Sequence, residues 1–398
     1  MTTDKLSRRQ FLINLSTGVI AGTALRGRPC LAAITPPWSN QDSQFVLFVG
    51  TYTLETKSEG IYGYYASQDV AKLDRFSSSK TVNPSFLAID RSNKYLYAVN
   101  EVGEYEGKPG GAVSAFALDH DGSKYNLRLL NQQPTLGADP CYVTVDSKRK
   151  NLLVANYTGG SVAVLPIRAD GSLGAATDGK QHEGSGPKEQ QKAPHAHCII
   201  LDRAEKYALA TDLGTDKIMI YRYDGERGKL TPHKHPFVQL QPGAGPRHLA
   251  FHPNGKYLYA INELDSTLTS FKYDDGKLKH IETLSTLPAD FTGVSYCADV
   301  HIHPSGEFLY GSNRGHNSIV VFKLDRGNGK LKLVEHVSTQ GDWPRNFAID
   351  PYGFNLLVAN QRSNNVVSFT IDRNNGRLRR DVNLVEEIPA PVCLRFLQ

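Results

Sequence analysis

The sequence contains little of what marks several common classes of protein. Its 398 residues include five cysteines, with no close pair typical of a metal site and no Cys-x-x-Cys-His motif for heme. The chain has 45 Lys and Arg and 40 Asp and Glu. Five of these basic residues and one of the acidic residues lie within the first 33 residues, so the rest of the chain has 40 basic and 39 acidic residues. Such a near-neutral body lacks the basic face that nucleic acid or a membrane surface would require. We therefore expect neither as a partner.

Long hydrophobic runs are also missing, and the most apolar stretch lies at the N-terminus. Phe11 to Leu25 is too short and too polar for a stable membrane span. It overlaps Ser7-Arg8-Arg9-Gln10-Phe11-Leu12, which matches the twin-arginine export pattern, and Ala32-Ala33 offers small residues for cleavage. Residues 1–33 are therefore predicted to be a twin-arginine signal peptide, with an ordinary amphipathic helix as the alternative. The mature protein is expected to be periplasmic or extracellular, without a membrane span.

Turn and strand residues are abundant. The chain has 35 Gly and 21 Pro, together with 19 Tyr and 16 Phe, and 40% of its residues are hydrophobic. This composition is typical of a soluble, turn-rich protein made of strands. The cysteines beyond the signal peptide, which are Cys141, Cys198, Cys297 and Cys393, are expected to be buried free thiols on inner strands.

One sequence unit recurs along the chain. It begins with Pro or a small residue, runs through an alternating strand to Asp or His six positions later, and reaches Asn or Asp after ten more. The complete copies begin at Pro84, Pro140, Ala196, Pro246, Cys297 and Pro344 and reach Asn100, Asn156, Asp212, Asn262, Asn313 and Asn360. These anchors lie 56, 56, 50, 51 and 47 residues apart, and each interval holds a second hairpin. The period predicts the four-stranded blades of a β-propeller.

The two chain ends supply the halves of a seventh copy. Phe45 to Thr51 matches only the second strand of the unit, and Pro391 to Phe396 matches only the first. A ring completed in this way leaves no exposed sheet edge. The sequence thus predicts an all-β, seven-bladed β-propeller over residues 45–398, closed by strands from both termini. Within it, the polar stretch Asp178 to Lys192 is expected to be a long loop on one rim.

Two positions of the unit should bring side chains from different blades together. The residue after the Pro-like start and the residue after the anchor converge at one mouth of the central channel. Flanking positions stay apolar, whereas these two vary among His, Arg, Glu and Tyr. We predict that a charged catalytic cluster forms there from His197, Arg247, Glu263 and Arg314. A structural salt-bridge network in a wet channel is the alternative.

Histidine and asparagine allow two further interpretations. His195 and His197 lie two residues apart, as do His301 and His303, and such pairs on a strand could hold a metal. No third ligand of matching spacing is identifiable, so no metal is predicted. The Asn anchors could be calcium ligands, but their recurrence favours a structural role, such as bonding the backbone. His252 and His303 replace the Asp of other copies and are expected to cap turns.

Several short motifs run through the repeat. They are Val49-Gly50-Thr51-Tyr52-Thr53, Val99-Asn100-Glu101, Pro194-His195-Ala196-His197, Gly245-Pro246-Arg247-His248, Asn262-Glu263-Leu264 and Ser312-Asn313-Arg314. With these motifs the chain resembles, from about Val46 to Phe396, the seven-bladed lactonases. That family includes the propeller-type bacterial 6-phosphogluconolactonase and the fungal 3-carboxy-cis,cis-muconate lactonizing enzyme.

The resemblance implies lactone chemistry at the predicted cluster. The proposed site of the muconate enzyme has one His, two Arg and one Glu, which match His197 or His195, Arg247, Arg314 and Glu263 here. A carboxylic ester hydrolase is implied, acting on a sugar-type lactone such as 6-phosphogluconolactone. Arginines would hold an anionic substrate, and Glu263 or His197 would activate water.

Further side chains are expected to bind this substrate. They are His195, His248, Arg345, Glu101, Tyr157 and His301. Arg345 is the extra cation that a phosphate would need, although an exported protein would rarely meet 6-phosphogluconolactone. A cycloisomerase of the carboxymuconate type and a non-catalytic propeller that binds a ligand or protein are the alternatives. We expect no cofactor, and a monomer or weak homo-oligomer.

Overall fold

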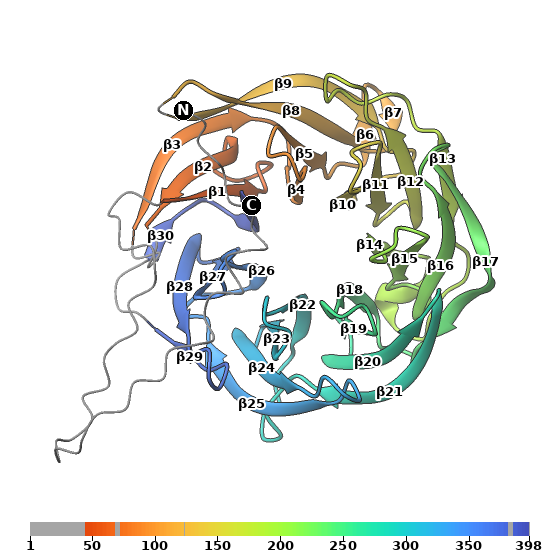
Figure 1. Cartoon of the computed structure of the whole chain (residues 1–398), viewed down its shortest axis with the longest axis vertical. Coiled ribbons are helices and arrows are strands. Elements are labelled where there is room, and N and C mark those ends of the chain that lie inside the picture. The colour runs from red at the N-terminus through yellow and green to blue at the C-terminus, as the bar shows by residue number, and fades with distance from the viewer. Residues whose placement is uncertain (1–43, 68–71, 123, 381–384, 398) are drawn as a thin grey trace, which may run out of the picture. The chain divides into compact units, whose positions relative to one another are not determined.

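The computed structural model describes residues 44–67, 72–122, 124–380 and 385–397, so the predicted signal peptide lies outside the described residues. The unit from Ser43 to Gln398 consists of seven antiparallel sheets that follow one another around a ring (Figure 1). Within the described ranges the only helix is the 3-10 turn η1 (Glu189–Gln191), and no helix there is long and apolar enough to cross a membrane. The predicted all-β, seven-bladed propeller is confirmed.

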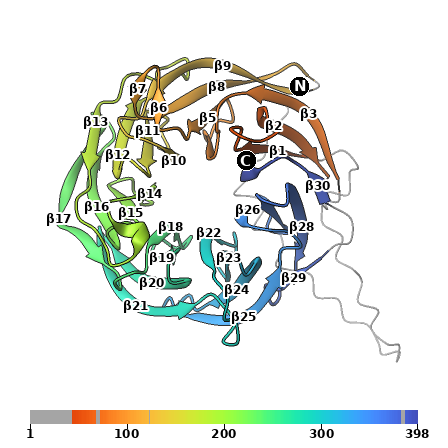
Figure 2. The same cartoon turned by 180° about the vertical axis from the view of Figure 1, so that it is seen from behind.

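Strands run from the channel outward within each blade, and the blades follow chain order (Figures 1 and 2). The first blade contains β31 (Pro391–Phe396), β1 (Phe45–Thr51), β2 (Gly60–Ala66) and β3 (Leu73–Lys80), and the second contains β4 (Leu87–Ile89), β5 (Tyr95–Asn100), β8 (Ala112–His120) and β9 (Tyr125–Pro134) with the hairpin β6 (Glu104–Tyr105) and β7 (Lys108–Pro109) inserted. The third contains β10 (Pro140–Val145), β11 (Asn151–Asn156), β12 (Ser161–Pro166) and β13 (Asp178–Gln181), and the fourth contains β14 (Ala196–Leu201), β15 (Tyr207–Asp212), β16 (Lys217–Asp224) and β17 (Lys229–Gln239). The fifth contains β18 (Pro246–Phe251), β19 (Tyr257–Asn262), β20 (Thr267–Asp274) and β21 (Lys277–Ser285), and the sixth contains β22 (Tyr296–Ile302), β23 (Phe308–Arg314), β24 (Ser318–Leu324) and β25 (Leu331–Ser338). The seventh contains β26 (Pro344–Ile349), β27 (Asn355–Asn360), β28 (Asn365–Ile371), β29 (Leu378–Arg379) and β30 (Val385–Glu387).

The hydrophobic core lies between adjacent blades. The second strands β11, β15, β19 and β27 are buried along their whole length. Core clusters combine side chains of neighbouring blades, as where Tyr259 and Ile261 of β19 pack with Val300 and Leu309 of the next blade. Each sheet is therefore covered on both faces, which requires apolar side chains on both sides of the strand.

Four of the five Asn anchors join their blade to the one before it, and Asn262 instead bonds hydroxyls within its own blade. The side-chain Nδ2 of Asn156 donates to the carbonyl of Thr135 at 3.0 Å, and Nδ2 of Asn313 donates to the carbonyl of Thr286 at 2.9 Å. Both carbonyls follow the outer strand of the preceding blade, and Asn360 makes the same bond. The recurrence of Asn thus has the structural role predicted from the repeat.

His252 and His303 cap turns, as expected. Nδ1 of His303 accepts the amide of Ser305 at 3.1 Å, where other blades use an Asp carboxylate. Its Nε2 lies 2.8 Å from the carbonyl of Gly353 in the next blade, and His252 makes the equivalent contact to Gly306 at 2.9 Å. Imidazole therefore replaces Asp in the turn and adds a bond between blades.

Strands from both chain ends close the ring. β1 pairs with β31 in antiparallel register from Leu47 opposite Phe396 to Gly50 opposite Cys393. Cys393 and the other described cysteines are buried and free, as predicted.

The predicted rim loop from Asp178 to Lys192 is only partly correct. Its start forms β13, and the rest contributes two buried side chains. Nδ1 of His182 lies 2.6 Å from Oδ2 of Asp212, and Nε2 of Gln191 donates to the carbonyl of Leu213 at 2.8 Å. The fourth blade has Asp212 as its anchor, where the other complete copies have Asn. The segment supplies His182 as a partner for the carboxylate of Asp212, and an Asn anchor would not need such a partner.

Candidate active site

The residue after the Pro-like start lies in a β-bulge in most of the inner strands. The register of β18 against β19 jumps from Pro246 to His248 and leaves Arg247 without a partner. The same irregularity occurs in β10, β14, β22, β26 and β31. A bulge releases a residue from the pleat and re-aims its side chain. The fold therefore presents these side chains at one end of the inner strands, called the mouth below, without involving them in the sheet ladder.

Glu263 lies between two buried arginines at this mouth. It follows Asn262, the last residue of β19, which pairs with Pro246 beside the bulge. Its Oε2 lies 3.0 Å from Nε of Arg247 and 2.8 Å from Nη2 of Arg314. The contact with Arg247 is an ion pair that lacks the alignment of a hydrogen bond. The arginines are 2% and 4% exposed, so one carboxylate oxygen holds two cations away from water.

Backbone carbonyls of β22 fix both guanidinium groups. Nη1 of Arg247 donates to the carbonyl of Ala298 at 2.6 Å, and Nη2 of Arg314 donates to that of Cys297 at 3.0 Å. Burial alone would raise the pKa of Glu263, but Arg314 and Arg247 hold it below its ordinary value. Burial lowers the pKa of Arg314 to about 10, although Glu263 opposes this shift. Glu263 and Arg314 are therefore charged together at neutral pH.

His197 lies beside this triad as a neutral imidazole. Its ring packs edge-on against Tyr157 and His248, with centroids 5.4 Å and 5.3 Å away, and Nδ1 lies 3.6 Å from Sγ of Cys141. Burial, followed by the charge of Arg247, lowers the pKa of His197 well below 6.5. The ring is thus unprotonated at neutral pH and offers a nitrogen lone pair next to the arginines.

His195 covers Tyr157 at the edge of the mouth. The two rings stack with centroids 4.5 Å apart, and Nδ1 of His195 lies 3.0 Å from the carbonyl of Tyr157. Burial, with Glu263 nearby, raises the pKa of Tyr157 to about 12.

Across the described ranges no three His, Cys, Asp or Glu side chains group as metal ligands would.

Arg345 and Glu101 form a second group with Tyr52. Nη2 of Arg345 donates to the hydroxyl of Tyr52 at 2.7 Å, and that hydroxyl donates to Oε1 of Glu101 at 2.8 Å. Nη2 of Arg345 lies 3.9 Å from Oε1 of Glu101, and the hydroxyl of Ser85 donates to Oε2 of Glu101. Sequence reasoning missed Tyr52 because the repeat rule selects the preceding Thr51, although Tyr52 belongs to the first family motif.

His301 lies away from the other predicted site residues. β22 runs from Tyr296, opposite Arg314, to Ile302, so His301 is near the opposite mouth. It reaches the site only through Asp299, whose oxygens lie 2.9 Å from Nε2 of His301 and 2.7 Å from Nδ1 of His248. Sequence reasoning missed Asp299 as well, because a two-residue bulge in β22 shifts it out of the expected position.

His248 is held as a neutral ring between Asp299 and Arg247. Burial and then the charge of Arg247 lower its pKa to about 3, against the effect of Asp299. Nη1 of Arg247 lies 2.9 Å from Nε2 of His248, which fits a ring whose Nδ1–H donates to Asp299 and whose Nε2 accepts. His248 thus helps to orient Arg247.

Comparisons with known proteins agree with this fold. Residues 46–396 match the family described as "Lactonase, 7-bladed beta-propeller". A Bacillus subtilis protein named 6-phosphogluconolactonase is 38% identical over 313 residues, which cover 78% of this chain and 86% of the relative. A protein of the same name from Formosa agariphila is 35% identical over 318 residues, covering 77% and 87%.

A solved structure extends the comparison to three dimensions. The periplasmic gluconolactonase PpgL of Pseudomonas aeruginosa superposes with a TM-score of 0.83 at 35% identity. The match covers 89% of this chain and 99% of that one. The similarity therefore includes every blade of the ring.

Proposed function

We propose, from the premise that this chain belongs to the family of seven-bladed β-propeller lactonases, that it hydrolyses a sugar-type lactone such as 6-phosphogluconolactone. As a lactonase it is a carboxylic ester hydrolase. One observation supports the site we assign: the carboxylate of Glu263 joins two buried arginines at one mouth of the channel. Three arginines against two glutamates at that mouth favour an anionic substrate.

Arg247 and Arg314 are proposed to bind the lactone carbonyl. When water adds, negative charge grows on the carbonyl oxygen, and donors that are already oriented in a buried site stabilise it most. The β22 carbonyls and Glu263 hold both guanidinium groups in place, so little reorganisation is needed. The ester C–O bond then breaks, the ring oxygen takes up the proton that the base removed from water and leaves as a hydroxyl, and the acyl carbon becomes a carboxylic acid that ionises to a carboxylate.

His197 is proposed as the base that takes a proton from water. Oε2 of Glu263 already holds two arginines, whereas the unprotonated imidazole of His197 takes part in no ion pair among the described residues. Glu263 is then the group that positions the arginines. Arg345 is proposed to bind the anionic end of the substrate, because its contacts to Tyr52 and Glu101 leave it 18% exposed.

Export is part of the same proposal. The periplasmic gluconolactonase of Pseudomonas aeruginosa supports an enzyme that works outside the cytoplasm. In that compartment an unphosphorylated gluconolactone would be a more accessible substrate. We expect the full chain to be recovered outside the cytoplasm and the variant with Arg8→Lys and Arg9→Lys to remain inside, as measured by cell fractionation. An unchanged location of the variant would contradict twin-arginine export.

A lactone panel tests the proposed activity. The full chain is assayed with 6-phosphogluconolactone, gluconolactone and a muconolactone. Arg247→Gln is expected to lower kcat/KM about 100-fold to 1,000-fold, the usual effect of removing a donor to a developing oxyanion. Arg222→Gln removes the same charge from an exposed position of β16 and serves as the matched control. Turnover of muconolactone alone would favour the cycloisomerase, and a folded protein that turns over no lactone would favour a binding propeller.

A further inference from the structure

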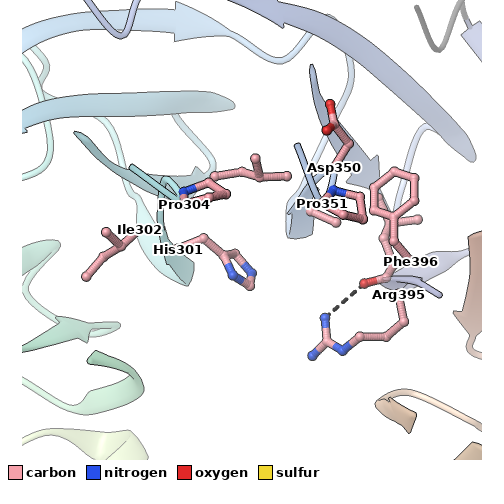
Figure 3. A pocket seen from close by; sticks show the side chains of 10 residues that line it. His301, Ile302, Pro304, Asp350, Pro351, Arg395 and Phe396 are labelled. Atoms are coloured by element: carbon pink, nitrogen blue, oxygen red, sulfur yellow. Dashed lines mark hydrogen bonds between the residues drawn. The ribbon is translucent and has the colours of Figure 1, made fainter. Parts of the chain in front are cut away.

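A cavity opens at the opposite mouth of the channel, where the inner strands end. It has a volume of about 550 Å³ and lies among the ends of β22, β26 and β31, with His301, Asp350 and Arg395 in its wall (Figure 3). A second cavity of about 220 Å³ lies between Arg395 and the ends of β4 and β10. The larger volume falls within the roughly 300–1,000 Å³ of sites that bind small molecules.

Arg395 brings to this cavity a charge that has no carboxylate within ion-pair distance among the described residues. Its Nε donates to the carbonyl of Leu87 and its Nη1 to that of Leu394, both at 2.9 Å. The guanidinium carbon lies 4.4 Å from the centre of the Phe86 ring. In the part of the chain that the structure describes, Arg395 forms no ion pair, and its Nη2 remains for a ligand. A partly buried cation without an ion pair favours an anion.

The acidic side chains nearby are already bonded. Asp350 accepts the amides of Tyr352 at 2.7 Å and Phe354 at 3.1 Å, which close its own turn. Asp299 is held between His248 and His301. His301 uses Nε2 for that contact, so its Nδ1 is left toward the cavity, and Figure 3 shows its ring and the Arg395 side chain reaching into the space between their strands.

We propose that this cavity binds a small hydroxylated carboxylate. The carboxylate pairs with Arg395, and a hydroxyl of the ligand forms a hydrogen bond with Nδ1 of His301. An arginine fork suits a carboxylate, and an imidazole nitrogen can form a hydrogen bond with a hydroxyl. The acid released by hydrolysis of a sugar lactone has this chemistry. The inference rests on the far mouth alone and does not require the proposed function.

Calorimetric titration of the full chain with gluconate tests the site. Gluconate is expected to bind in a one-to-one ratio, whereas glucose, which has similar hydroxyls without the charge, is not. Arg395→Gln should weaken the binding about tenfold or more, and His301→Leu about fivefold, as expected for a charged and a neutral hydrogen bond. Arg91→Gln removes a charge from an exposed turn after β4 and should change the affinity less than about twofold. Thermal melting verifies that each variant is folded, and Arg395→Lys, which keeps the charge, should bind better than Arg395→Gln.

Several results would overturn the inference. One is the absence of gluconate binding to the wild type. Another is loss of binding in Arg345→Gln with retention in Arg395→Gln, which would place the acid at the candidate active site. Inorganic phosphate binding as tightly as gluconate, without any effect of His301→Leu, would leave no role for the hydroxyl. Because lactone turnover is assayed separately, failure here is distinguishable from failure of the proposed function.

Discussion

Replacing Glu263 by Gln should affect stability and catalysis through the same contacts. The substitution keeps the shape of the side chain and removes the charge that Oε2 presents to Arg247 at 3.0 Å and to Arg314 at 2.8 Å. Both arginines are nearly inaccessible to solvent, so water cannot replace the carboxylate. Two like charges would then be buried side by side.

The size of the effect follows from this burial. Removing one partner of a buried ion pair lowers the free energy of unfolding by about 3–5 kcal/mol, because the remaining charge stays desolvated. In a domain of this size that corresponds to a fall in Tm of roughly 4–7 °C. Below that Tm, kcat/KM should also fall about 100-fold or more, since the arginines are no longer aligned for the oxyanion.

A second variant separates the two effects. Adding Arg314→Gln to Glu263→Gln removes one of the stranded cations, so the double variant should melt higher than Glu263→Gln alone while remaining inactive. Differential scanning calorimetry and lactone hydrolysis below the transition measure both quantities. The reasoning is refuted if Glu263→Gln melts within about 1 °C of wild type, or if the double variant shows the sum of the two single losses.

The pH dependence provides an independent check on Glu263. Its folded-state pKa lies below the ordinary 4.5, so the ionised form contributes stability that is present above 4.5 and is lost as pH falls through the folded value. The gap in Tm between wild type and Glu263→Gln should therefore narrow as pH is lowered from 7 to about 3. Other carboxylates titrate equally in both proteins and cancel in the difference. A gap that widens toward acid would contradict the assignment.

Three further predictions concern other parts of the ring. The side chain of Leu394 in the closing strand is fully buried, so Leu394→Ala should lower the free energy of unfolding by about 2–5 kcal/mol and Leu394→Met by less than about 1.5 kcal/mol. Deletion of residues 391–398 should abolish the cooperative unfolding transition, and chemical denaturation measures both effects. Asp299→Asn should lower kcat about tenfold, because His248 loses the charged partner that orients it beside Arg247, and an unchanged kcat would exclude this role. Arg345→Gln should raise KM for 6-phosphogluconolactone by about tenfold and KM for gluconolactone much less, and equal changes would show that Arg345 does not bind phosphate.

The repeat predicted the ring well because each residue type that recurs in the repeat has a local role. Asn156, Asn313 and Asn360 bond the preceding blade, and His303 replaces a turn-capping Asp with the same geometry. These roles depend on positions within one blade and its neighbour. A periodic sequence therefore carries them directly.

The site was only partly predictable, for reasons that the bulges explain. Counting from the repeat placed Arg247 and Glu263 together, because every copy keeps the same distance between start and anchor. It could not show that β22 has two residues in its bulge, which makes Asp299 the partner of His248. Nor did it select Tyr52, which lies one residue beyond the counted position and reaches Glu101 through the length of its ring.

The bulge also explains how this scaffold can vary its chemistry without losing its fold. Arg247 makes no ladder pair with β19, so replacing it changes no backbone hydrogen bond between the strands. Its neighbours behave differently: Asn262 bonds hydroxyls within its blade, and His248 is clamped by Asp299. The stability of each blade therefore depends on the anchors, while the bulge residue is limited mainly by the charges around it. In this chain Oε2 of Glu263 pairs with Arg247 and Arg314 at once, so a change at Glu263 affects both arginines.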